Sequence, residues 1–262
     1  MKTNISHPYH LLTSSPWPYL MSSSLFLTAI GLIIYIHYSK IIFLFMGLIF
    51  TIYCLFSWSK DIIIESTFLG YHTNIIIQTL KIGFILFILS EIFFFLSFFW
   101  TFFHSSLSPS IEIGTLWPPI GINPLNPLSI PLLNTILLLS SGITVTWSHY
   151  ALISSNYKET LTSLLITITL GITFTLFQLF EYNQATFSFA CSIYGSIFYL
   201  LTGFHGFHVL VGTLLLIICY YRITYYHFTT SHHLGFITTS WYWHFVDIIW
   251  LFLYIIVYWW GS

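Results

Sequence analysis

Long apolar runs separated by short polar breaks dominate the sequence. Seven of these runs reach about 18 residues or more, the length that crosses a bilayer of about 30 Å as a helix. They lie at roughly 17–38, 41–58, 75–103, 130–154, 160–180, 188–221 and 237–259. The breaks are Lys40, KDIIIESTFLGYHT, the Pro-rich stretch 109–131, and the NYKE, EYNQ and HFTTSHH segments. Because lipid offers backbone amides no partners, each run is predicted to be helical.

Composition supports this interpretation and excludes other classes. The chain is 57% hydrophobic and only 5% charged, against about 25% charged in an average soluble domain. A net charge of −1 provides no basic field for nucleic acid. We therefore predict an all-α membrane protein of seven transmembrane helices, a single polytopic domain over residues 1–262. Its first two helices would span 17–58 and the other five 75–259.

The few cations predict the orientation of the helices. If seven spans alternate, the N-terminus and the second, fourth and sixth loops share one side, which holds Lys2, Lys60, Lys158 and Arg222, with Lys81 close to it. The opposite side holds Lys40. The positive-inside tendency then places the N-terminus in the cytoplasm or matrix, which argues against a seven-helix receptor.

An acid in the third run is the clearest candidate for chemistry. Glu91 lies in SEIFFFLSFFW, where a charged side chain costs on the order of 2.5–3.5 kcal/mol. It is therefore expected to face protein or trapped water and to stay uncharged. Two roles are open: a proton relay, ligand or lipid contact, and a hydrogen-bonded structural carboxyl.

Two further pairs of polar residues lie at helical spacing in apolar runs. In GFHGFH, His205 and His208 are three apart and would share a helix face. They could bind a metal or haem, or pack through hydrogen bonds, with Glu91 as one possible partner. In WYWHFVDIIW, His244 and Asp247 have the same spacing and could pair locally.

Other reactive side chains have simpler interpretations. The three cysteines show no C-x-x-C pairing and are predicted to be buried small hydrophobes, at positions Cys54, Cys191 and Cys219. His232 and His233 lie in a polar loop and are predicted to be solvated. The cations Lys60, Lys158 and Arg222 either extend to the interface or bind anionic lipid headgroups.

Four longer stretches resemble one known family. These are SEIFFFLSFFWTFFHSSLSP, WPPIGINPLNPLSIPLLNT, GFHGFHVLVGT and HHLGFITTSWYWHFVDIIWLFLYIIVYWWGS. Together they closely resemble subunit III of cytochrome c oxidase, from the PYHLLTSSPWP opening to the YWWGS end. The resemblance implies that a lipid-filled cleft splits the seven helices into a two-helix and a five-helix bundle.

The resemblance also implies partners and cofactors. Subunit III assembles with subunits I and II and with small accessory subunits in a complex that oxidises cytochrome c, reduces O₂ to water and pumps protons. The haems and copper belong to the partner subunits, and this chain would carry no cofactor besides bound phospholipids. Its implied roles are stabilising the catalytic core and sustaining proton uptake.

Residue by residue, the resemblance assigns a carboxyl beside the lipid cleft to Glu91 and headgroup contacts to Trp58, Lys60 and Arg222. Lys60 stands where the family commonly has Arg, and a lysine cannot form a bidentate fork with phosphate. The lipid contact there is predicted to be weaker.

The composition also predicts the cellular compartment of the protein, and two rival functions remain open. Four alanines, five valines and one arginine beside 27 phenylalanines fit AT-rich codons, and nothing resembles a cleavable presequence. We therefore predict a mitochondrial inner-membrane protein with its N-terminus in the matrix and C-terminus in the intermembrane space; a bacterial oxidase is the alternative. The rival functions are a proton-coupled transporter or channel using Glu91, His205 and His208, and a cytochrome b-like electron carrier.

Overall fold

Seven long helices make up the fold of the residues that the structure describes. The computed structural model describes residues 9–10 and 14–261, so Lys2 and part of the PYHLLTSSPWP opening lie outside the described residues. The helices are α1 (Trp17–Tyr38), α2 (Ile42–Thr67), α3 (Asn74–Leu107), α4 (Ile130–Ile153), α5 (Tyr157–Gln184), α6 (Ile193–Thr224) and α7 (Leu234–Leu253), and α7 continues into the π-helical segment η2 (Tyr254–Trp260). All seven are long and apolar enough to cross a membrane, which confirms the predicted fold class.

Several helices extend beyond their predicted ends, and two of them take in segments that were predicted as breaks. The KDIIIEST part of a predicted break belongs to α2, which ends at Thr67, and the EYNQ segment belongs to α5, which ends at Gln184. Hydropathy measures the length of chain that lipid can cover, whereas a helix continues as long as its backbone hydrogen bonds do. The sixth span differs in the other direction, because α6 begins at Ile193 and not at 188.

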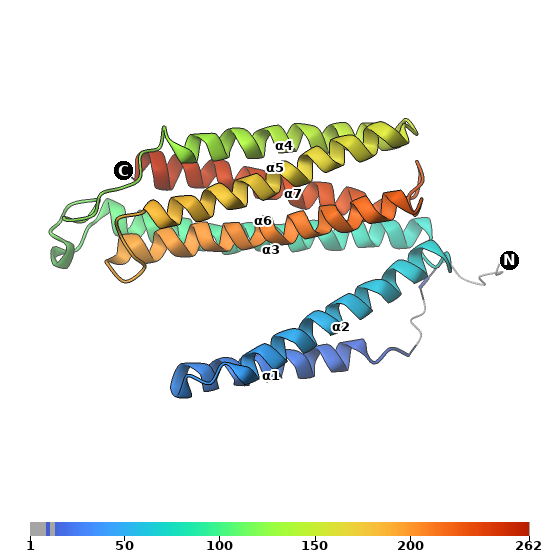
Figure 1. Ribbon diagram of the computed structural model, residues 1–262, viewed down its shortest axis with the longest axis horizontal. Coiled ribbons are helices and arrows are strands. Elements are labelled where there is room, and N and C mark those ends of the chain that lie inside the picture. The colour runs from blue at the N-terminus through green and yellow to red at the C-terminus, as the bar shows by residue number, and fades with distance from the viewer. Residues whose placement is uncertain (1–8, 11–13, 262) are drawn as a thin grey trace. The chain divides into compact units, whose positions relative to one another are not determined.

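The chain divides into two compact units, Met1–Leu80 and Lys81–Ser262. In the first unit, α1 and α2 form an antiparallel hairpin (Figure 1). Two glycines bring its backbones together: a Cβ on Gly31 would lie 2.7 Å from the amide nitrogen of Leu44, and one on Gly47 would lie 2.8 Å from Cα of Thr28. Small residues at such crossings let membrane helices pack closely without a hydrophobic driving force.

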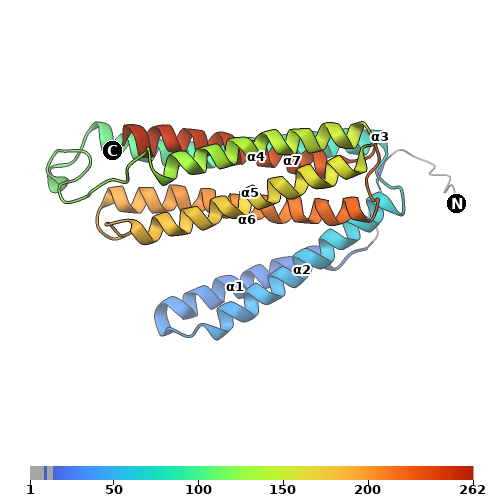
Figure 2. The same ribbon diagram turned by 45° about the horizontal axis from the view of Figure 1, so that its top comes forward.

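In the second unit, α3 to α7 run along a common axis, as the two views in Figures 1 and 2 agree. Of these five, α7 is the most buried along its span and α3 the least. The central contact is Trp243 of α7, whose indole lies against Gly171 of α5 and Gly212 of α6 and donates a 2.9 Å hydrogen bond to Ser141 of α4. One aromatic side chain therefore joins four helices.

The Pro-rich connection between α3 and α4 lies at the same end of the second unit as the C-terminus (Figure 1). It holds one short 3₁₀ turn, η1 (Ile111–Ile113). The Trp117 ring packs 5.4 Å from Phe102 and 5.5 Å from Tyr194, between centroids. This contact attaches the loop to α3 and α6. The predicted lipid-filled cleft between a two-helix and a five-helix bundle stays a prediction.

Candidate functional site

Glu91 of α3 contacts His208 of α6. The Glu91 Oε2 atom lies 3.0 Å from His208 Nε2, and the Glu91 side chain is 22% exposed. The other ring nitrogen, Nδ1, lies 2.7 Å from the backbone carbonyl oxygen of Phe204. A carbonyl oxygen accepts only, so Nδ1 of His208 must carry a proton.

This tautomer fixes what the pair can do. With Nδ1 protonated, Nε2 of a neutral imidazole is an acceptor, and the carboxyl must then be the donor. In the other form the imidazole carries both protons and Glu91 is ionised. Either way one proton lies between Oε2 of Glu91 and Nε2 of His208. An ionised carboxyl beside a neutral imidazole would set two lone pairs against each other.

Aromatic rings surround this pair. The His208 ring centroid lies 5.1 Å from that of Phe95, 6.2 Å from that of Tyr242 and 6.2 Å from that of Phe245. Phe95 is fully buried and the other two nearly so. Excluding water lowers the local dielectric, which strengthens the hydrogen bond within the pair.

His205 does not join His208. Its Nε2 lies 3.2 Å from the carbonyl oxygen of Val246 on α7, and its ring centroid lies 5.1 Å from that of Trp250. The two histidines share one side of α6, as their spacing predicts, yet their Nε2 atoms meet polar partners on different helices, α7 for His205 and α3 for His208. Within residues 9–10 and 14–261, no three His, Cys, Asp or Glu side chains are grouped closely enough to hold a metal ion.

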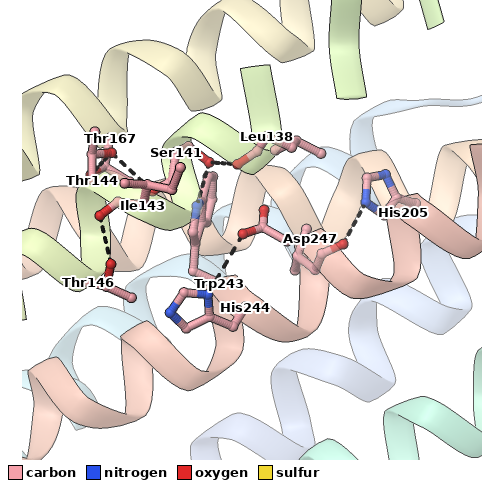
Figure 3. A network of polar contacts seen from close by, with 11 residues as sticks. Leu138, Ser141, Ile143, Thr144, Thr146, Thr167, His205, Trp243, His244 and Asp247 are labelled. Carbon is pink, nitrogen blue, oxygen red and sulfur yellow. Dashed lines mark hydrogen bonds and ion pairs between the residues drawn. The ribbon is translucent and has the colours of Figure 1, made fainter. Parts of the chain in front are cut away.

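His244 and Asp247 are neighbours on α7 without a close hydrogen bond. Nδ1 of His244 lies 3.8 Å from Oδ2 of Asp247, which is longer than a hydrogen bond. Figure 3 shows the Asp247 carboxyl facing His244, with the Trp243 indole reaching Ser141 beside them. Gly142 of α4 makes room for this carboxyl, since a Cβ there would lie 2.6 Å from Oδ2. His244 and Asp247 are thus neighbours at ion-pair distance, without a hydrogen bond between them.

The predicted lipid-binding residues lie in two places. Trp58 is half-buried and Lys60 is exposed, both within α2. Arg222, in the last turn of α6, is half-buried, and its guanidinium carbon lies 4.2 Å from the ring centroid of Phe228. This cation–π contact holds the connection between α6 and α7 against the end of α6.

Two sequence predictions about single residues are wrong. Cys191 is exposed, unlike the buried Cys54 and Cys219. It lies in the connection before α6, where Ser192 accepts a hydrogen bond as the helix cap. His233 is buried, with Nε2 3.3 Å from Nε2 of His149 on α4. Its loop folds back onto the bundle, a tertiary contact that local polarity does not reveal.

One buried acid escaped the sequence analysis. Glu181 is 1% exposed, and its Oε1 accepts a 2.6 Å hydrogen bond from the Tyr258 hydroxyl. Gln178, one turn earlier on α5, donates to the same oxygen at 3.4 Å. The EYNQ segment has the composition of a break, and this concealed Glu181. The signal that could have found it is the i, i+3 spacing of Gln178 and Glu181 in a continuing helix.

Comparisons with known proteins agree with this architecture. The sequence profile of the family described as cytochrome c oxidase subunit III matches residues 7–262. Proteins named cytochrome c oxidase subunit 3 are similar over nearly their whole length. That of Struthio camelus is 52% identical over 257 residues, covering 98% of each chain, and that of Equus caballus is 51% identical over 260 residues, covering 99% of this chain and 100% of its own. That of Branchiostoma lanceolatum is 50% identical over 256 residues, covering 98% of each chain. The chain therefore belongs to the cytochrome c oxidase subunit III family and is a membrane subunit of a respiratory oxidase complex.

Proposed function

We propose that this chain supports proton uptake by the oxidase, stabilises its catalytic core and binds phospholipids, while the haems and copper lie in partner subunits. It assembles beside subunits I and II in the mitochondrial inner membrane, together with accessory subunits, and meets cytochrome c only through the complex. The observation that carries the proposal is the 3.0 Å contact between Glu91 Oε2 and His208 Nε2, which, with Nδ1 bonded to the Phe204 carbonyl, implies one proton between the two side chains.

The pair suits a proton-related role for a physical reason. A proton can move between Oε2 of Glu91 and Nε2 of His208 without changing the net charge of the pair. A second proton arriving, or the shared one leaving, makes the pair charged, which surrounding apolar side chains disfavour. The neutral pair with one shared proton is therefore favoured. Because the Glu91 side chain is partly exposed on α3, this proton can exchange with groups outside the helix bundle.

The test is Glu91→Gln in the assembled oxidase, with Glu159→Gln as the matched control. Glu159 is an exposed acid in the first turn of α5. Losing one charge-assisted hydrogen bond corresponds to roughly a tenfold slower proton uptake, with subunit content and haem spectrum unchanged. Normal uptake in Glu91→Gln would refute the proton role, and loss of assembly would make Glu91 structural.

Phospholipid binding is supported by two cations, Arg222 in the last turn of α6 and exposed Lys60 within α2. Arg222 can present its guanidinium to a phosphate from the end of α6, and exposed Lys60 offers a point charge from α2. Arg222→Ala should reduce the anionic phospholipid that co-purifies with the oxidase, and Lys60→Arg should raise it. The control is Lys40→Ala, at an exposed position in the connection between α1 and α2. Unchanged lipid content in both variants would remove these residues from the lipid sites.

The proposed orientation has the N-terminus in the matrix and the C-terminus in the intermembrane space. The distribution of Lys60, Lys158 and Arg222 against Lys40 supports it. Exposed Cys191, in the connection between α5 and α6, then faces the intermembrane space. A membrane-impermeant maleimide should label it in mitochondria whose outer membrane is open. Labelling only after the inner membrane is opened would reverse the orientation.

A further inference from the structure

The hydrogen bonds around the buried Glu181 carboxyl leave some of its polar atoms, and some of its neighbours' polar atoms, without a partner. Both donors that reach it, the Tyr258 hydroxyl and the Gln178 amide, point at Oε1. Its Oε2 atom is buried and has no hydrogen-bond partner among the described residues, and the same holds for Oε1 of Gln178. Two buried acceptors therefore lack a donor.

Charge compensation is also missing from its surroundings. The titratable groups whose electrostatic surroundings include Glu181 are phenols: Tyr258 of η2, Tyr182 of α5 and Tyr199 of α6. No salt bridge to Glu181 is present in the described part of the chain. A buried carboxylate without a cation is expensive, so such a group binds a proton instead.

One proton and one water molecule would satisfy both acceptors. Protonation turns Oε2 from an acceptor into a donor, and a water brings two more donors. Oε1 then remains the carbonyl oxygen, and it is the atom that Tyr258 already contacts at 2.6 Å. The arrangement of donors thus matches the neutral acid.

We propose that Glu181 binds a proton and an internal water molecule, forming a second proton-binding site between α5 and η2, distinct from the Glu91–His208 pair. Gln178 and Tyr258 position the carboxyl, and the water links its Oε2 to Oε1 of Gln178. This site goes beyond the proposed function, because nothing in that function uses Glu181.

Infrared difference spectroscopy of the assembled oxidase tests the proposal. Glu181→Gln should remove one protonated-carboxyl C=O band at neutral pH, a band that shifts in D₂O. Tyr258→Phe should move that band to higher frequency, because the carbonyl loses its hydrogen bond. Glu91→Gln, the matched substitution at the other acid, should leave the band in place.

Each outcome decides the question. No band lost in Glu181→Gln, or a carboxylate band lost in its place, overturns the proposal. If Glu181→Gln fails to assemble, Tyr258→Phe decides alone: a shifted carboxylic band supports the site and an unshifted spectrum refutes it. These results are independent of proton uptake in Glu91→Gln, so this proposal and the proposed function can fail separately.

Discussion

Glu91 and Glu181, two acids of the second unit, occupy contrasting environments. Glu91 is partly exposed on peripheral α3 and contacts a base, whereas Glu181 is buried between α5 and η2 and contacts a phenol. An imidazole can take the proton from a carboxyl, whereas the Tyr258 phenol cannot take it and instead donates its own hydrogen bond to Glu181. Burial and partner together suit Glu91 to exchange a proton and Glu181 to hold one.

The largest effect should come from replacing each acid in turn with alanine. Glu181→Ala leaves a cavity and strands buried polar atoms, so we expect a destabilisation of about 4 kcal/mol. Glu91→Ala is partly relieved by solvent or lipid and should cost about 1 kcal/mol. The measurement is the temperature at which subunit III dissociates from the purified oxidase. Equal losses in the two variants would contradict the contrast in burial.

A smaller effect tests the phenol. Tyr258→Phe keeps the ring and removes one donor to Glu181, which should destabilise the subunit by about 1.5 kcal/mol. Tyr254→Phe is the matched control in the same segment, because the Tyr254 hydroxyl makes a weak 3.4 Å contact with the Pro127 carbonyl. It should change stability by less than about 0.5 kcal/mol. The two variants are compared in the same dissociation assay. A larger loss of stability in Tyr254→Phe than in Tyr258→Phe would show that the Tyr258 hydroxyl does not stabilise the subunit through Glu181.

The smallest effect concerns the reactivity of an exposed thiol compared with that of buried thiols. Hydrogen bonds from the Ser188 hydroxyl and backbone N–H lower the pKa of exposed Cys191. Its thiolate therefore forms at lower pH than an ordinary thiol does, and alkylation by a maleimide should begin at lower pH. Ser188→Ala should raise the pH needed for alkylation, and buried Cys54 and Cys219 should stay unlabelled. A pH profile that does not change in Ser188→Ala would exclude this hydrogen bond as the cause.

Sequence alone predicted the helices well because hydropathy reports directly on lipid contact. The first span matches α1 at Trp17–Tyr38, and the Glu91 carboxyl was conspicuous because apolar residues surround it. Glu181 was missed for the opposite reason: the polar residues next to it have the composition of a turn. Its burial depends on η2 folding back against α5, about 77 residues further along the chain.

The histidines show the same limit. Spacing placed His205 and His208 on one side of α6, but only packing assigns the first to the Val246 carbonyl and the second to Glu91. Likewise, the HFTTSHH loop appeared solvated, although His233 is buried against His149. Helical periodicity fixes the face of a residue; the partner it meets there is set by tertiary contacts.

The central claim is that Glu91 and His208 share one proton and act as a unit. The most direct measurement is a double-mutant cycle on the rate of proton uptake by the assembled oxidase, using Glu91→Gln, His208→Gln and the double variant. A shared proton predicts that the double variant is no slower than the slower single variant. Rate losses that multiply, with each residue contributing independently, would contradict the account.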